Sequence, residues 1–483
     1  MNNLYQLLEQ QARIHGNKTA LSNGQESLTF SQLRDLSARM SARLASQGVN
    51  SGQKIYVLMQ PNIEWIATAA LFHRGCVSCS AHPGAVVGDE LPFTPDWIVT
   101  DRDGIEGENV IRIDQAWFNG LGAYPADQPA ARYEADECVR IILTSGTTGI
   151  PKGAPLSLNS LRHRVEQLIG DWVSPLGDGL NLMPLSTIGG LSSALYSWRA
   201  GRPYFTVFSE AGLVGLLART GMSCLTGSPA QISKFLQIYE RERTPLPALK
   251  EIRMAGSAVS PRLLNAILQT FNVDVYSIYG STEAGGTGMV KLDSPADLTK
   301  TAYVRPQVDV EIVNENDEVL LPGAEGIVRV RSAANISGYL NDVDADAFRD
   351  GWFYPGDRGS LSSERLLTLS AREAEVINRG GEKISPVLID NFLQSYPGIE
   401  DAAVFGVENK LGVAEVAAAL VIPEDFDIPA LQAALRAELN PVAVPQHLFR
   451  VNSVPRNQMG KPLRVQMAAS FREQLVAAGR PGF

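Results

Sequence analysis

The chain has 483 residues, of which 45% are hydrophobic and 19% charged, and its formal net charge is −10. This length is too great for one ordinary core and predicts two or three domains. The negative charge argues against a nucleic-acid-binding protein, which requires a basic face, but not against a local site for an anionic ligand.

Two further features concern location and metal binding. No stretch approaches 18 uninterrupted apolar residues, and Met1–Lys18 lacks the apolar core of a signal peptide. Cys76 and Cys79 form an isolated C-x-x-C, and only His73 and His82 lie close enough in sequence to complete a zinc site. We therefore expect free thiols and a cytoplasmic protein without a membrane segment.

Strands and helices alternate along the first 280 residues. Thr29 and Gln32 have the spacing of a capping box and predict the start of a helix that ends at Gly48. The run 55–59 predicts a buried strand, and the run 63–72 predicts a helix. This alternation predicts an α/β architecture with largely parallel sheets.

The pattern changes twice after residue 300. Alternating residues at 308–313 and 326–330 predict antiparallel strands or a small barrel. After about residue 376, an α+β pattern follows. Its helices are expected at 386–396, at 428–439 and after 465, and its strands at 402–406 and 415–421. We predict an N-terminal domain 1–372 and a C-terminal domain 373–483.

Residues 143–153 are the most informative segment, with the sequence Leu-Thr-Ser-Gly-Thr-Thr-Gly-Ile-Pro-Lys-Gly. Glycines let backbone N–H groups approach an anion, while hydroxyls add donors and the lysine adds charge. The segment follows a predicted strand at 138–143 and lacks the Gly-Lys-Ser/Thr ending of a Walker loop. It predicts a phosphate-binding loop, which comprises Thr144, Ser145, Gly146, Thr147, Thr148, Gly149 and Lys152.

Three further segments place polar side chains in turns. Residues 279–283 leave a predicted strand, and the Glu283 carboxylate beside the Thr282 hydroxyl suits Mg²⁺ and a phosphate. Asp357 follows a Gly/Pro turn, and a carboxylate there can accept hydrogen bonds from both hydroxyls of a ribose. Lys461 lies in a turn near the C-terminus, where an ammonium can stabilise developing negative charge. Each segment alone is also compatible with a strand exit, a hairpin turn or a surface lysine.

Taken in this order and spacing, the four segments resemble those of the adenylate-forming superfamily of acyl-CoA synthetases, carrier-protein adenylation domains and luciferases. The resemblance runs from about residue 4 to 470. It implies an α/β fold with a large N-terminal domain of α/β subdomains and a small β-barrel-like section. It also implies a small, mobile α+β C-terminal lid, with the active site between the two.

The resemblance also implies roles for individual residues. Lys461, Thr282 and Glu283 would be catalytic, with Glu283 meeting Mg²⁺, and Asp357 would bind the ribose. Arg372 would be the arginine before a hinge near Ala374. Further ATP-binding positions would be Gly256, Ser257, Ala258, Tyr279, Gly280 and Ser281, besides the phosphate-binding loop. The loop that approaches the acceptor would contain Gly380, Gly381 and Glu382.

The chain departs from the family where the acid substrate would bind. Thr187 replaces the histidine that usually gates the acyl pocket, and Ile188 stands where adenylation domains for α-amino acids carry an aspartate. An ammonium without a partner is costly to bury, so an aromatic, alicyclic or aliphatic acid is expected rather than an α-amino acid. Room along the pocket would come from four glycines, which are Gly189, Gly190, Gly285 and Gly286.

The resemblance implies a two-step reaction that uses ATP and Mg²⁺. A carboxylic acid is first activated to an acyl-adenylate with release of pyrophosphate, and the acyl group then passes to a thiol of CoA or of a phosphopantetheinyl carrier protein. One alternative is transfer to an amine, which would give an amide ligase. Another is a nucleotide-binding module without catalysis, against which Thr282, Glu283, Asp357 and Lys461 argue. The family is compatible with a monomer or a homodimer.

Overall fold

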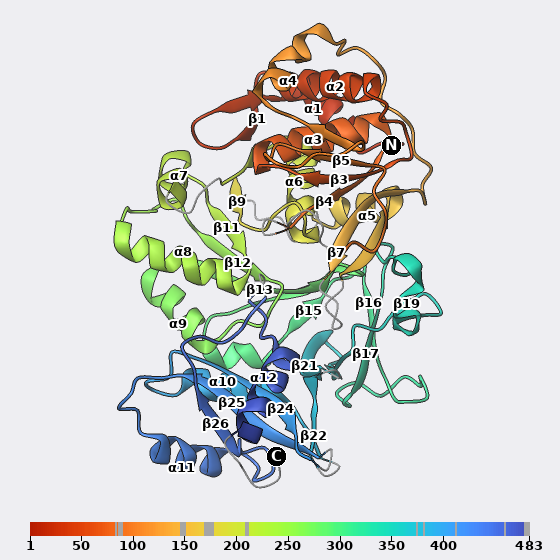
Figure 1. Cartoon of the computed structure of the whole chain (residues 1–483). Helices are drawn as coiled ribbons and strands as arrows, with labels where there is room; N and C mark the ends of the chain where they lie inside the picture. The colour runs from red at the N-terminus through yellow and green to blue at the C-terminus, as the bar shows by residue number, and fades with distance from the viewer. Residues whose placement is uncertain are drawn as a thin grey trace.

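The computed structural model describes residues 1–82, 85, 90–144, 151–168, 178–207, 212–372, 375–379, 382–410, 413–457 and 460–477. The side chains of Ala371, Glu382 and Lys383 are outside this description. Two large sheets follow one another along the molecule, and a smaller C-terminal sheet lies at the opposite end from the N-terminus (Figure 1).

The N-terminal sheet has the strand order β6-β5-β3-β4-β7-β8. Its first five strands are parallel, and β8 runs antiparallel to β7. Their bounds are β3 (Lys54–Leu58), β4 (Val77–Ser80), β5 (Trp97–Thr100), β6 (Val110–Arg112), β7 (Cys138–Thr144) and β8 (Lys152–Ser157). The predicted strand at 55–59 and the predicted parallel arrangement are confirmed.

Helices cover this sheet and bury its apolar side chains. These helices are α1 (Tyr5–His15), α2 (Phe30–Ser46), α3 (Pro61–Arg74), α5 (Leu158–Gln167) and α6 (Ile188–Ala200). The short helix α4 (Gln115–Asn119) and the small sheet of β1 (Thr19–Ser22), β2 (Ser27–Thr29) and β10 (Tyr204–Phe205) add side chains to the same apolar core. The predicted capping box is confirmed, because Thr29 accepts from the Gln32 backbone N–H and Gln32 bonds back to the Thr29 N–H. Trp65 and Trp198 pack against each other in the core, with ring centroids 4.3 Å apart and the ring planes tilted by 31°.

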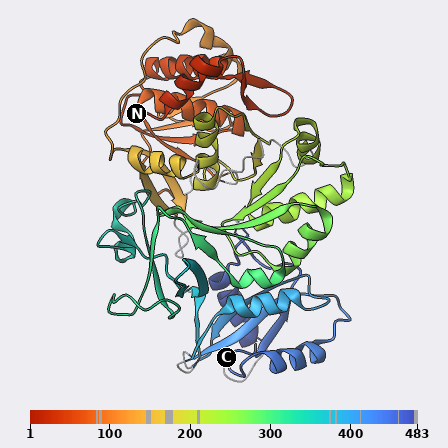
Figure 2. The ribbon, with the colours of Figure 1, turned by 180° about the vertical axis from the view of Figure 1, so that it is seen from behind.

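The second sheet begins with four parallel strands in the order β9-β11-β12-β13 and continues through antiparallel β14 and β15. Their bounds are β9 (Gly179–Asn181), β11 (Cys224–Gly227), β12 (Glu251–Ala255), β13 (Asp274–Ser281), β14 (Gly285–Lys291) and β15 (Ala302–Val304). Helices α7 (Leu213–Thr220), α8 (Pro229–Glu242) and α9 (Pro261–Thr270) share a core with this sheet. Viewed from behind, they lie on its outer side (Figure 2).

The antiparallel section predicted after residue 303 is present and joins the second sheet. Strand β15 pairs with β21, which leads to β20, β17, β19 and β18, while β16 pairs with β17. The bounds are β16 (Asp309–Val313), β17 (Gly326–Arg331), β18 (Phe348–Arg349), β19 (Trp352–Phe353), β20 (Asp357–Leu361) and β21 (Leu366–Arg372). A continuous hydrogen-bonded path therefore links the Tyr279 strand to the Asp357 strand.

The C-terminal part has its own sheet of β24 (Asp401–Glu408), β25 (Ala414–Val421) and β26 (His447–Arg450). Separate apolar clusters cover its two faces. Around it lie the hairpin β22 (Ile377–Arg379) to β23 (Glu382–Ile384) and the helices α10 (Pro386–Ser395), α11 (Ile428–Glu438) and α12 (Arg464–Ala477). The predicted α+β pattern is confirmed, and β26 is an addition to it. The boundary at 372/373 stays a prediction.

Cys76 and Cys79 are free thiols, and burial raises the pKa of each to about 12. Among the residues that the structure describes, no group of three His, Cys, Asp or Glu side chains is arranged to hold a metal ion. Over the same described ranges, no helix combines the length and apolar character needed to span a membrane.

Candidate active site

Two of the predicted segments leave neighbouring parallel strands at the same edge of the second sheet. Gly256, in the left-handed region at φ +97°, follows β12, and Thr282 and Glu283 follow β13. The carboxyl ends of parallel strands share one edge, where α/β proteins usually bind ligands. The topology therefore brings the residue 256–258 turn and Glu283 to one side of the sheet.

Asp357 lies at the start of β20 and is held by two of the predicted site residues. Its carboxylate accepts a hydrogen bond from the Tyr279 hydroxyl at 2.6 Å and lies 3.3 Å from Nε of Arg372. The pairing of β20 with β21 sets Asp357 opposite Arg372. Burial raises the pKa of Asp357, while the charges of Arg372 and Lys461 and the Tyr279 hydrogen bond act to lower it.

Lys461 comes to this cluster from the C-terminal part. Its turn is closed by Asn457, whose Oδ1 accepts from the Lys461 N–H at 3.0 Å and whose own N–H donates to the Lys461 carbonyl at 2.9 Å. Gly460, at φ +80°, faces Ala230 of α8, and a Cβ on it would lie 2.8 Å from the Ala230 Cβ. The turn is therefore seated directly on the N-terminal part.

The charges around Lys461 show which groups it faces. Burial lowers the pKa of Lys461, and so does the charge of Arg372, whereas the carboxylates of Asp357, Glu375 and Glu283 raise it. Lys461, Asp357, Arg372 and Glu283 thus form one electrostatic cluster between the two parts of the chain.

Side chains that the sequence did not indicate hold Glu283. The Tyr339 hydroxyl donates to its Oε1 at 2.6 Å. Arg164 of α5 donates through Nη2 to the carbonyls of Thr282 at 2.9 Å, Glu283 at 3.2 Å and Ala334 at 2.6 Å. Burial lowers the pKa of the Arg164 guanidinium to about 10, against the opposite effect of Glu283. Arg164 therefore fixes the backbone that carries Glu283, and Tyr339 fixes the carboxylate.

The predicted phosphate-binding loop is described only at its ends. Lys152, the first residue of β8, forms an ion pair with Asp344 and lies 5.2 Å from the centroid of the Tyr339 ring. Thr144 ends β7, and its Oγ1 donates to the Lys152 carbonyl at 3.5 Å. Because Tyr339 contacts both Lys152 and Glu283, one side chain connects these two segments. Ser145, Gly146, Thr147, Thr148 and Gly149 lie outside the described residues.

The predicted pocket residues lie at the start of α6 and in β14. Thr187 caps α6, since its Oγ1 accepts from the Gly190 N–H at 3.2 Å. A Cβ on Gly189 would meet only the end of the Met183 side chain, whereas one on Gly190 would fall on the Pro184 carbonyl. A Cβ on Gly285 or Gly286 would be in ordinary van der Waals contact with Arg164 or Arg305, respectively, and Gly285 has φ +77°. Gly190 therefore has a packing reason that is independent of any pocket.

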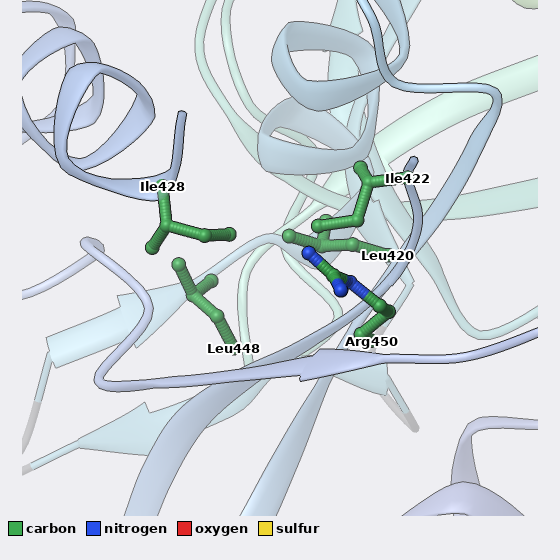
Figure 3. A pocket seen from close by; sticks show the side chains of 5 residues that line it. All are labelled: Leu420, Ile422, Ile428, Leu448 and Arg450. Carbon is green, nitrogen blue, oxygen red and sulfur yellow. The ribbon is translucent and has the colours of Figure 1, made fainter. Parts of the chain in front are cut away.

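The predicted acceptor loop falls largely outside the description. Gly380, Gly381 and the hinge residue Ala374 are among the residues not described, and Glu382 begins β23. A recess of about 230 Å³ does occur in the C-terminal part, between β25, β26 and α11 (Figure 3). No predicted site residue lines it. Its lining residues are Leu420, Ile422, Ile428, Leu448 and Arg450.

Arg164 gave a weak signal in the sequence and Tyr339 gave none. Arg164 lies on the same helical face as Leu161 and Val165, so a charged residue occupies a face that should be buried. Tyr339 lies 56 residues from Glu283 in sequence, and only the folded chain brings them together.

Comparisons with known proteins agree with this arrangement. The family model of the AMP-binding enzymes matches residues 8–86 and 86–340, and that of the AMP-binding enzyme C-terminal domain matches residues 388–461. An oxalate–CoA ligase from Arabidopsis thaliana is 26% identical, covering 97% of this chain and 98% of its own. A 2-succinylbenzoate–CoA ligase from Bacillus cereus is 27% identical, covering 96% and 98%. The chain spans only 18% of a matching naringenin synthase from Pestalotiopsis fici.

Solved structures extend the agreement to the fold. The o-succinylbenzoate CoA synthetase of Bacillus subtilis, in complex with its acyl-adenylate intermediate, superposes with a TM-score of 0.81 at 23% identity, covering 95% of this chain and 97% of its own. It has also been solved with ATP and a magnesium ion. Family models that cover most of the sequence, together with this fold, show that the chain belongs to the family of AMP-binding enzymes.

Proposed function

We propose that this protein is an AMP-forming acid–thiol ligase. It activates a carboxylic acid with ATP, releases pyrophosphate, and transfers the acyl group to the thiol of CoA. The observation that carries this proposal is the seating of the Lys461 turn against Ala230, which brings a lysine to the Asp357–Arg372 pair and to Glu283. Its CoA-ligase relatives support the same reaction.

In the first step, an oxygen of the acid attacks the α-phosphorus of ATP, and the bond to pyrophosphate breaks. Such a transfer needs positioning and charge neutralisation rather than covalent work by the protein. Asp357 would accept hydrogen bonds from the ribose hydroxyls, and Lys461 would neutralise charge on the reacting phosphate. The buried Glu283 carboxylate, oriented by Tyr339, fits a Mg²⁺ ion, which would neutralise phosphate charge when bound.

In the second step, the acceptor sulfur attacks the acyl carbonyl, and AMP leaves. Water must be excluded between the steps, because an acyl-adenylate is a mixed anhydride that hydrolyses readily.

We infer that the acid is not an α-amino acid. The start of α6 carries the apolar Ile188 where an ammonium would need a carboxylate. A carrier-protein pantetheine is a second candidate acceptor. We propose the cytoplasm as the location, because it supplies ATP and CoA.

The test of catalysis is the exchange of pyrophosphate into ATP in the presence of a panel of carboxylic acids. Lys461→Ala should nearly abolish acid-dependent exchange, because the cation at the reacting phosphate is removed, while thermal unfolding stays unchanged. The exposed Lys410 of the same C-terminal part gives the matched control Lys410→Ala, which should exchange at the wild-type rate. Near-normal exchange by Lys461→Ala would remove this lysine from the mechanism.

The acceptor is tested separately with the acid that supports exchange. CoA, a phosphopantetheinyl carrier protein and free amino acids are offered in turn, and the products are identified by mass spectrometry. A thioester with CoA is expected. Formation of an amide, with no thioester, would instead identify an amide ligase.

A further inference from the structure

The strand that leads to the predicted phosphate-binding loop carries a fully buried guanidinium. Arg140 of β7 has no exposed surface and stands directly opposite Ser78 of β4 in the register of the N-terminal sheet. Its Nη1 donates to the Ser78 hydroxyl at 3.1 Å, and its Nη2 donates to the hydroxyl of Ser80, two residues along the same face. The charge of Arg140 therefore lies in the core, where an ion without compensation is costly.

Helix α3 supplies the compensating charge. Glu64 is buried in the second turn of α3 and shares a side-chain hydrogen bond with Ser80. Burial raises the pKa of Glu64 to about 7, while the Ser80 hydrogen bond and the charge of Arg140 act to lower it. The Glu64 carboxylate in turn raises the pKa of Arg140, against the effect of burial. Ser80 thus connects a buried arginine to a buried glutamate.

The third contact of Arg140 is with the turn that precedes α6. Its Nη2 also donates to the Leu185 carbonyl at 2.8 Å, across 45 residues of sequence. This carbonyl lies two residues before Thr187, which caps α6, and three before Ile188. Thr187 and Ile188 belong to the predicted acid pocket. Arg140 therefore anchors the backbone that carries these pocket residues.

The anchor differs from the bonds that shape the turn itself. Asn181 accepts from the Met183 N–H at 2.9 Å and donates to the Gly189 carbonyl at 3.0 Å. Such local bonds would persist if this stretch of chain moved as a unit. The bond from Arg140 instead joins the stretch to β7, which ends at Thr144, where the predicted phosphate-binding loop begins.

We propose that Arg140 is a positioning residue for the acid substrate; this rests on the proposed function. It holds the turn before α6 at a fixed place relative to β7 and thus to the start of the phosphate-binding loop. The acid and the α-phosphate of ATP must approach to about 3–3.5 Å in order to react. A fixed relation between their two binding segments favours this approach. Arg140 acts through the Leu185 carbonyl and needs no contact with either substrate.

The first variant is Arg140→Met, assayed by ATP–pyrophosphate exchange with the acid that supports it best. An assay at about pH 8 keeps Glu64 mainly ionised, because this pH lies above its pKa. The KM for the acid should rise about 10-fold, the effect of losing one hydrogen bond from a charged donor, while the KM for ATP changes less than about two-fold. A general loss of structure would instead lower the amount of active enzyme and leave both KM values unchanged.

A double variant separates positioning from folding. Arg140→Met leaves the Glu64 charge buried without its partner, and breaking a buried pair is strongly destabilising. Glu64→Gln combined with Arg140→Met removes both charges and should regain much of the thermal stability, since a buried pair can be replaced as a whole at little cost. The double variant still lacks a donor to the Leu185 carbonyl, so its KM for the acid should stay raised.

Two further variants complete the comparison. Arg140→Lys keeps the positive charge near Glu64, but an ammonium lacks the forked donors that serve the Leu185 carbonyl and two serines together, so its KM for the acid should be intermediate. Arg112→Met is the matched control in β6 of the same sheet. It removes an arginine whose partner Asp103 is exposed, and it should keep both wild-type KM values.

The two levels of the proposal fail differently. A wild-type KM for the acid in the double variant, or in Arg140→Lys where that variant alone folds, would show that Arg140 does not position the acid, while the ligase function stands. If no acid of a broad panel supports exchange by the wild-type enzyme, the proposed function itself is overturned.

Discussion

Charged groups from several elements together set the pKa of Lys461. Arg372 at the end of β21 lowers its pKa, while Glu375, Asp357 and Glu283 raise it. Glu375 is also bound by Arg464, whose Nε lies 2.9 Å from its Oε2. The protonation of Lys461 therefore depends on a balance that one substitution can change.

We predict that Glu375→Gln moves the alkaline limit of adenylation to lower pH. The reaction needs the charged ammonium, so activity is kept below the pKa of Lys461 and is lost as the pH rises through it. Removing the Glu375 charge removes one of the influences that raise this pKa, and the pKa falls further. The measurement is the pH profile of acid-dependent pyrophosphate exchange.

The control for this profile is Glu415→Gln. Glu415 also has an ionisable neighbour in the C-terminal part, because its Oε2 lies 2.8 Å from Nε2 of His447, but it is not among the groups that shift the pKa of Lys461. The alkaline limit of adenylation by the Glu415→Gln variant should match that of the wild type. A limit that stays fixed in Glu375→Gln, or moves to higher pH, would contradict the electrostatic assignment.

At the scale of elements, the start of α6 combines a cap with a close backbone approach. The chain turns at Pro184 so sharply that the Thr187 N–H donates to the Pro184 carbonyl at 2.9 Å, and the Thr187 hydroxyl donates to the same carbonyl at 2.8 Å. Gly190 then lies directly over this turn. The glycine is required by local packing, whatever binds nearby.

We predict that Gly190→Ala lowers the midpoint temperature of unfolding. Its Cβ would meet backbone atoms, including the Met183 carbonyl oxygen at 2.6 Å, so the turn or the helix must shift, at a cost of about 1–3 kcal/mol. The adjacent Gly189→Ala is the matched control, because it meets only the flexible end of Met183. Equal melting temperatures for the two variants would show that the turn can adapt.

Elements whose signals are local could be predicted from the sequence. The capping box at Thr29, the strand at β3 and the α+β pattern after residue 376 each depend on neighbouring residues. Strand β26 was missed, because the four residues His447–Arg450 carry two charged or polar ends and acquire their pairing only from β25. Short strands that depend on a partner leave little trace in the sequence.

The candidate site likewise contains some residues that the sequence indicates and others that only the fold brings together. Tyr279, Asp357, Arg372 and Lys461 belong to segments with recognisable sequences, and the structure gathers them into one cluster. Arg164 reaches Thr282 across 118 residues, and Asp344 reaches Lys152 across 192. Such contacts are set by the topology of the two sheets and not by any local pattern. Their catalytic roles remain predictions.

At the scale of the whole molecule, the C-terminal part presents different surfaces for the two proposed steps. The Lys461 turn faces the N-terminal part, whereas the β22–β23 hairpin, which carries the predicted acceptor loop, lies near the remote end of the C-terminal part (Figure 1). Arg379 fixes this hairpin by donating to the Val442 carbonyl at 2.7 Å. This arrangement fits the proposed adenylation step, and we expect a rotated one for thioester formation.

We predict that Arg262→Ala slows adenylation more than thioester formation. Arg262 of α9 donates through Nη1 to the carbonyls of Ile399 and Glu400, each at 3.1 Å, and so holds the present orientation. Removing these bonds lowers the population in which Lys461 reaches Asp357, so the exchange rate should fall several-fold, less than in Lys461→Ala. Single-turnover assays measure adenylation and then the reaction of preformed adenylate with CoA.

The exposed Arg241 of α8 provides the control Arg241→Ala, which should leave both steps unchanged. Equal slowing of both steps by Arg262→Ala would indicate general loss of structure, since the Arg262 bonds are expected to break when the C-terminal part rotates. Faster thioester formation, by contrast, would follow if the loss of these bonds makes rotation of the C-terminal part easier. The ratio of the two rates therefore reports on the orientation of the C-terminal part independently of protein stability.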